Sequence, residues 1–156
     1  MIEKDTVRLL RECDAGVKMG VDSIDSIIDR VKSRRLKSGL NRCKDEHEQL
    51  RAEIGALLNR FGDEGKEPSA IALGMSHLKT NMKMLHAPFD KTVADLMTDG
   101  CNMGVKSLSK YLNEYKAASE QSKDIAKRLI GLEEGLARQL RDFLSSRHTA
   151  PKMPDT

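Results

Sequence analysis

A six-residue motif occurs twice in the chain, and it constrains the fold more than any other feature of the sequence. Cys13-Asp14-Ala15-Gly16-Val17-Lys18 returns as Cys101-Asn102-Met103-Gly104-Val105-Lys106, with four of the six positions identical. Each copy lies in a long amphipathic segment that is followed by a second amphipathic segment. Internal repetition of this kind is typical of a structural unit used twice. The repeat therefore predicts two helical hairpins that meet around a shared core.

Apolar residues recur at alternating spacings of three and four, which places them on one face of a helix. The clearest stripe reads Leu40, Cys43, His47, Leu50, Ile54, Leu57 and Phe61. No segment shows the alternation of a β-strand. We expect four helices, at residues 5–33, 38–61, 90–116 and 120–145. The expected N-caps of the first three are Asp5 or Thr6, Ser38, and Asp90, whose side-chain oxygens can accept free backbone N–H groups.

A fifth amphipathic segment lies between the two hairpins. It runs over residues 69–85 and ends at His86-Ala87-Pro88, since proline cannot continue a helix. We expect it to be a crossover helix that carries the chain back along the bundle. Residues 1–145 would then form one helical domain, and residues 146–156 a flexible C-terminal tail.

The composition narrows the class of protein. A chain of 156 residues is long enough to bury a core as one domain. Three cysteines without tight spacing do not make a disulfide framework, which favours a reducing compartment. The N-terminus lacks the apolar run of a signal peptide, and no stretch approaches the roughly 20 apolar residues that cross a bilayer. We therefore predict a cytoplasmic protein without a membrane partner.

Two repeated hairpins joined by a long helical crossover resemble the ferritin-like superfamily, in particular the small stand-alone bacterial ferritin-like proteins of unknown function. The cues are the segments from Leu10 to Gly16, from Ser69 to Leu85 and from Cys101 to Tyr111. The resemblance covers residues 5 to 145. It implies an all-α, ferritin-like four-helix bundle of two repeated hairpins with an additional crossover helix.

The catalytic motif of the superfamily is missing. Di-iron members carry a Glu on two helices and Glu-x-x-His on the other two. No Glu-x-x-His occurs here: the residue three places after Glu46 is Gln49, and the residue three places after Glu133 is Leu136. Ferroxidase or oxygenase activity is therefore not carried over, and we predict no catalytic and no cofactor-binding residues.

A few polar residues interrupt the apolar stripes. Counting about 1.5 Å per residue from the turns gives the depth of each residue along the bundle axis. The expected depths of His47, Cys101 and Glu133 agree within about 5 Å, whereas that of Cys13 differs by about 15 Å. Cys43 and His47 are four residues apart, a spacing that puts both on one helix face and suits a transition metal.

Two interpretations of this cluster stay open. The first is a transition-metal or redox site formed by Cys43, His47, Cys101 and Glu133, with Asp25 nearby. The second is a buried polar cluster in which His47 is hydrogen-bonded to Glu133 and the thiols pack as small hydrophobes. We favour the second, because no further motif supports a metal.

Basic residues crowd the turn between the first two helices: Arg30, Lys32, Arg34, Arg35, Lys37 and Arg42. Such a group can attract an anion or nucleic acid. No aromatic residue interleaves with it, the net charge is only +3, and cations suit the C-terminal end of a helix. We expect a solvated helix end and no nucleic-acid partner. The sequence thus favours a non-catalytic protein with an interaction or structural role in a homo-oligomer.

Overall fold

The computed structural model describes residues 2–68 and 89–146, and its regular elements within these ranges are all helices. They are α1 (Ile2–Asp25), the short 3₁₀ helix η1 (Ile28–Arg30), α2 (Arg34–Arg60), α4 (Phe89–Glu114) and α5 (Glu120–Ser146). The chain is thus an all-α bundle of four long helices over the described part. The expected crossover helix at 69–85 and residues 147–156 of the expected tail lie outside the described residues.

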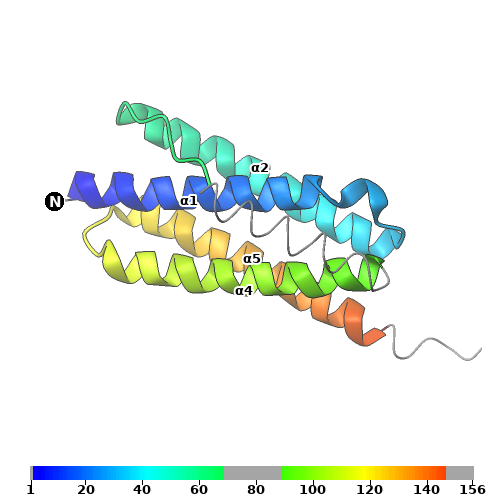
Figure 1. Ribbon diagram of the computed structural model, residues 1–156. Helices are drawn as coiled ribbons and strands as arrows, with labels where there is room; N and C mark the ends of the chain where they lie inside the picture. The colour runs from blue at the N-terminus through cyan, green and yellow to red at the C-terminus, as the bar shows by residue number, and fades with distance from the viewer. Residues whose placement is uncertain (1, 69–88, 147–156) are drawn as a thin grey trace, which may run out of the picture.

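The helices form two hairpins, α1 with α2 and α4 with α5, and the hairpins pack against each other (Figure 1). Helix α5 contacts all three of the others, whereas α2 and α4 lie diagonally opposite. The colour gradient shows that α1 and α5 run in one direction and α2 and α4 in the other (Figure 1). Each hairpin therefore has its turn at the opposite end of the bundle from the turn of the other hairpin.

Polar side chains at the start of each hairpin hold the turn of the other one. At one end, Asp5 Oδ2 accepts the N–H of Ala117 at 3.1 Å, and Thr6 Oγ1 accepts the N–H of Ser119 at 2.8 Å. The prediction that one of these two residues is the N-cap of the first helix is wrong, because α1 already begins at Ile2. Their oxygens satisfy the turn between α4 and α5 instead.

The carboxylate of Asp90 does the same at the other end of the bundle. Its two oxygens accept the N–H groups of Lys32 and Ser33 at 3.0 and 2.7 Å. The prediction that Asp90 caps its own helix is therefore wrong as well. Its bonds hold the chain just after Val31 in an extended conformation, so the backbone N–H groups of the turn are satisfied without a helix.

The first helix is shorter than expected, and the two bonds of Asp90 hold the extended chain that follows it. The sequence predicts a helix to residue 33, but α1 ends at Asp25 and only the short η1 follows. The next helix begins early, at Arg34, with Ser33 as its N-cap: Ser33 Oγ accepts the N–H of Leu36 at 3.2 Å. Ser38, the expected cap, lies inside α2. The predicted position of this turn is wrong because Asp90, nearly sixty residues away in the sequence, bonds its backbone.

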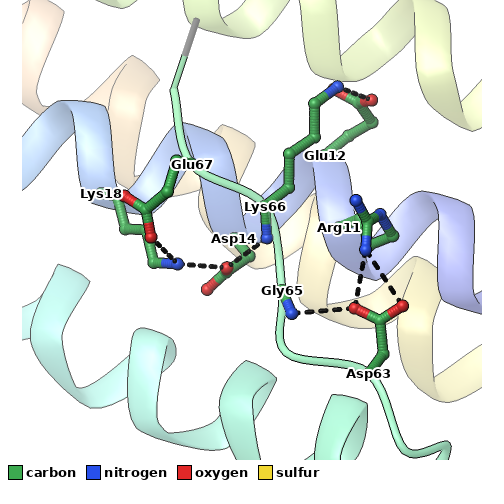
Figure 2. A network of polar contacts seen from close by, with 8 residues as sticks. All are labelled: Arg11, Glu12, Asp14, Lys18, Asp63, Gly65, Lys66 and Glu67. Atoms are coloured by element: carbon green, nitrogen blue, oxygen red, sulfur yellow. Dashed lines mark hydrogen bonds and ion pairs between the residues drawn. The ribbon is translucent and has the colours of Figure 1, made fainter.

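Residues 62–68 leave the end of α2 and lie across α1 (Figure 2). Gly62, with φ of +69°, ends α2, and the N–H groups of Gly62 and Asp63 bond back to the carbonyls of Asn59 and Leu58. The Asp63 carboxylate then forms a two-pronged ion pair with Arg11 on α1, at 2.9 and 3.0 Å. The segment is therefore fixed to α1 at its first residues.

Asp14 on α1 is the most buried residue in the contact between α1 and residues 62–68, with only 4% of its surface exposed. Its carboxylate accepts the backbone N–H of Lys66 at 3.0 Å and pairs with Lys18 Nζ at 2.7 Å (Figure 2). Gly65 has a φ of +92°, and a Cβ built there would collide with Asp14 Oδ2. Glycine is required at this position for both reasons, the backbone conformation and the close approach.

Replacing Gly65 with alanine should therefore lower the free energy of unfolding by about 1–3 kcal/mol. Gly55 is the matched control, since it lies in α2 with nothing within 4 Å of a built Cβ. Gly55→Ala should raise the free energy of unfolding by up to about 1 kcal/mol. Urea denaturation of both variants measures the difference; equal effects of the same sign would contradict the packing of residues 62–68 on Asp14.

Candidate polar site in the bundle core

The apolar core of the described residues is divided into two clusters along the bundle axis. One contains Val17, Leu50, Leu108 and Leu129, and the other contains Ile24, Leu40, Cys101 and Leu136. Between the two clusters, each helix contributes one residue that is not hydrophobic: Gly20 on α1, His47 on α2, Gly104 on α4 and Glu133 on α5. We call these four residues the polar layer.

The imidazole of His47 is the centre of the polar layer, and its side chain is only 1% exposed. Nδ1 lies 2.8 Å from the backbone carbonyl of Cys43 and 3.4 Å from Cys43 Sγ. Nε2 lies 2.9 Å from Glu133 Oε1. A carbonyl oxygen can only accept, so Nδ1 carries a proton and donates it to the Cys43 carbonyl. The second proton of the site lies between Nε2 and the Glu133 carboxylate.

The surroundings of His47 favour its charged form. Burial by itself lowers the pKa of His47, but the hydrogen bonds with Cys43 and Glu133 and the negative charge of Glu133 outweigh burial and raise the pKa to about 10. The residue is therefore protonated at neutral pH and forms an ion pair with Glu133, whose side chain is 13% exposed. Two buried charges of opposite sign thus satisfy each other between two apolar clusters.

Gly20 makes room for the pair, and Gly104 lies next to it. A Cβ built on Gly20 would lie 2.9 Å from His47 Cδ2, closer than carbon atoms pack. A Cβ on Gly104 would lie 3.5 Å from Glu133 Oε2, in ordinary contact. Gly20 therefore lets the imidazole ring lie directly against the backbone of α1. The glycines of the repeated motif, Gly16 and Gly104, would place a Cβ at ordinary contact distance from Leu129 and Glu133 respectively.

Two of the buried thiols, Cys101 and Cys13, are protonated at neutral pH. Burial raises the pKa of the Cys101 thiol, and the negative charge of Glu133 raises it further. Burial also raises the pKa of Cys13 to about 12, with Glu12 and Asp14 adding to it. All three cysteines are buried and free. Since the thiolate is the nucleophile, the arrangement does not activate Cys13 or Cys101.

The four predicted site residues lie together: Cys43 and Glu133 both contact His47, and Cys101 interacts with Glu133. Asp25, expected nearby, lies at the surface and pairs with Lys44. Cys13 belongs to the other apolar cluster. Within residues 2–68 and 89–146, no group of three or more His, Cys, Asp or Glu is placed to hold a metal ion. Binding of a transition metal stays a prediction that only metal analysis can test.

The residues that the sequence did not mark as part of the site are Gly20 and Gly104. Both stand on the apolar stripes of their helices, at the level of the polar residues. A glycine on a buried stripe, opposite a large polar side chain on another helix, is the signal that points to them.

The fold is similar to that of one solved protein. The crystal structure of a DUF305 fragment from Deinococcus radiodurans superposes with a TM-score of 0.72 and 15% sequence identity, over 91% of this chain and 96% of that one. At this level of identity the likeness shows an all-helical fold alone. No family model and no curated protein matches the chain. Over the described helices, none is long and apolar enough to cross a membrane.

The packing of His47 on Gly20 gives a direct test. Gly20→Ala should lower the free energy of unfolding by about 1–3 kcal/mol, because the new methyl group displaces the imidazole from Glu133. Gly16→Ala, four residues earlier on the same helix, meets Leu129 only at 3.7 Å and should be neutral or stabilising. Urea denaturation compares the two. A Gly20→Ala variant as stable as Gly16→Ala would show that the ring does not lie against α1.

The raised pKa of His47 predicts a loss of stability toward alkaline pH. In the folded protein, His47 loses its proton only at a pKa of about 10, whereas in the unfolded chain it loses it at the ordinary pKa of 6.5. The stabilisation is therefore complete below pH 6.5 and is lost as pH rises through 10. Well above pH 6.5 and well below pH 10, the free energy of unfolding should fall by about 1.4 kcal/mol per pH unit.

The control for this pH dependence is the double variant His47→Gln with Glu133→Gln, which cannot titrate at this site. Its free energy of unfolding should be nearly flat over the same range, whatever its absolute value. Denaturation curves at a series of pH values measure both slopes. The same slope in the double variant would assign the pH dependence to groups outside the polar layer.

Proposed function

We propose that this protein is a non-catalytic, ferritin-like helical bundle that acts by interaction and works as a homo-oligomer. The observation that carries the proposal is the closed polar layer. His47 has both ring nitrogens bonded within the protein, and its carboxylate partner is nearly buried. A substrate would have to displace these bonds from a packed core, which supports a structural role for the pair.

The direction of the helices supports the ferritin-like part of the proposal. In the ferritin-like bundle that the sequence resembles, a long connection between two hairpins brings the chain back along the bundle. Here α2 and α4 run in the same direction, and the start of α4 lies at the turn between α1 and α2. The motif shared by α1 and α4 agrees with two copies of one hairpin.

Exposed apolar side chains support the oligomer. Met103 on α4 is 69% exposed and Phe61 at the end of α2 is 41% exposed, although most large apolar residues of the described chain are buried. Such side chains are frequent in contacts between subunits. The three free thiols agree with a reducing compartment, so we propose the cytoplasm as its location.

Light scattering on a size-exclusion column tests the proposed oligomer. The full chain should elute with a mass that is a multiple of 17.4 kDa. Met103→Lys should shift the protein toward the monomer, because Met103 is the most exposed of these apolar side chains. The control is Lys106→Gln, an exposed change one turn away. A monomer at all concentrations would contradict the oligomer.

The second candidate function is binding of a transition metal, and one contact favours it. A histidine that binds a metal through Nε2 commonly donates Nδ1–H to a carbonyl, as His47 does to Cys43. The predicted ligands are His47, Glu133, Cys43 and Cys101: a metal bound at Nε2 would lie on the side of Glu133 and Cys101, whereas Cys43 contacts the Nδ1 side of the ring. Metal analysis of protein purified with and without His47→Gln decides between the two. A metal present in the wild type and lost in the variant would support the site.

A further inference from the structure

The first half of α2 presents an exposed basic face. From residue 30 to residue 44 the chain has no acidic residue and seven basic ones: Arg30, Lys32, Arg34, Arg35, Lys37, Arg42 and Lys44. Lys44 pairs with Asp25, and Arg30 lies over the ring of Phe89. Four of the others are exposed and have no anionic partner among the described residues: Lys32, Arg34, Lys37 and Arg42.

Three of these cations, Arg34, Lys37 and Arg42, lie on one side of α2, and Lys32 lies in the turn just before it. An open depression of about 580 Å³ is lined by Arg34, Lys37, Ser38, Asn41, Arg42 and Asp45. The opposite side of α2 is packed in the core through Leu36, Leu40 and Cys43. The basic side therefore faces outward over successive turns, and Arg34 and Arg42 are about 12 Å apart along the axis.

Because α2 begins at Arg34, these cations lie at the N-terminal end of a helix and not, as the sequence predicts, at the C-terminal end of one. As part of the C-terminal end of the first helix, they would be stabilised by the helix dipole. In the structure, Arg34, Arg35 and Lys37 lie at the N-terminal end of α2, where the positive end of the helix dipole repels cations. The first turns of α1, α4 and α5 each contain an acidic residue, and that of α2 contains none. The basic side chains are thus not accounted for by stabilisation of their own helix.

We propose that this face of α2 binds the phosphate backbone of double-stranded nucleic acid. The exposed cations complement a row of phosphates, and Ser38 and Asn41 between them add neutral hydrogen-bonding groups. No aromatic side chain lines the depression, so stacking on the bases of a single strand is not available. No apolar side chain lines it either, which argues against insertion into a lipid surface. The proposal is independent of the oligomer and of the polar layer.

The test is fluorescence anisotropy of the full chain with a labelled DNA duplex of mixed sequence, over a series of salt concentrations. Four phosphate contacts predict that log K falls against log salt with a slope of roughly −3 to −4. The Arg34→Gln with Arg42→Gln variant should weaken binding by about tenfold or more at low salt and reduce the slope by about 2. Asp45→Asn should strengthen binding, because it removes the one anion that lines the depression.

The matched control is Arg60→Gln with Lys127→Gln, which changes the net charge equally at exposed positions away from this face. It should keep the slope of the wild type. An equal loss in the control would mean that net charge alone attracts the duplex and would overturn the proposal. So would absence of binding at low salt, or a preference for the single strand, for vesicles with anionic lipid or for an acidic peptide over the duplex. Circular dichroism of each variant establishes that the helices are intact.

Discussion

The ion pair between His47 and Glu133 is the polar contact that aligns α2 with α5 in the middle of the bundle. Each charge is nearly withdrawn from water, so either one alone would be strongly destabilising. Displacing α5 along α2 by one helical turn, about 5.4 Å, would separate the pair and leave both charges among apolar side chains. The pair therefore favours one axial alignment, which the apolar clusters on either side of it would not select by themselves.

The turns of the bundle are held by the same kind of long-range contact. Asp5 and Thr6 bond the turn between α4 and α5, and Asp90 bonds the turn between α1 and α2. Each hairpin thus satisfies the free backbone groups of the other at opposite ends of the molecule. Together with the pair in the middle, these contacts connect the hairpins at three levels along the bundle.

The charges in the core of the bundle are paired, whereas several on its surface are not. In the core, His47 and Glu133 satisfy each other, which agrees with a structural role. On the outer face of α2, Arg34, Lys37 and Arg42 are exposed and have no anionic partner among the described residues, and Arg34 and Lys37 oppose the dipole of their own helix. The charged groups that a partner could bind therefore lie at the surface. For this reason both proposals concern interaction.

The sequence by itself determined the helical class of the fold and the meeting of His47 with Glu133, because a helix has a fixed period and a fixed rise per residue. A stripe such as Leu40, Cys43 and His47 gives the buried face, and counting residues gives its depth. The tertiary structure decided where α1 ends, which turn each polar side chain holds, and that Gly20 receives the imidazole ring. Those features depend on residues distant in the sequence, whose proximity no local pattern encodes.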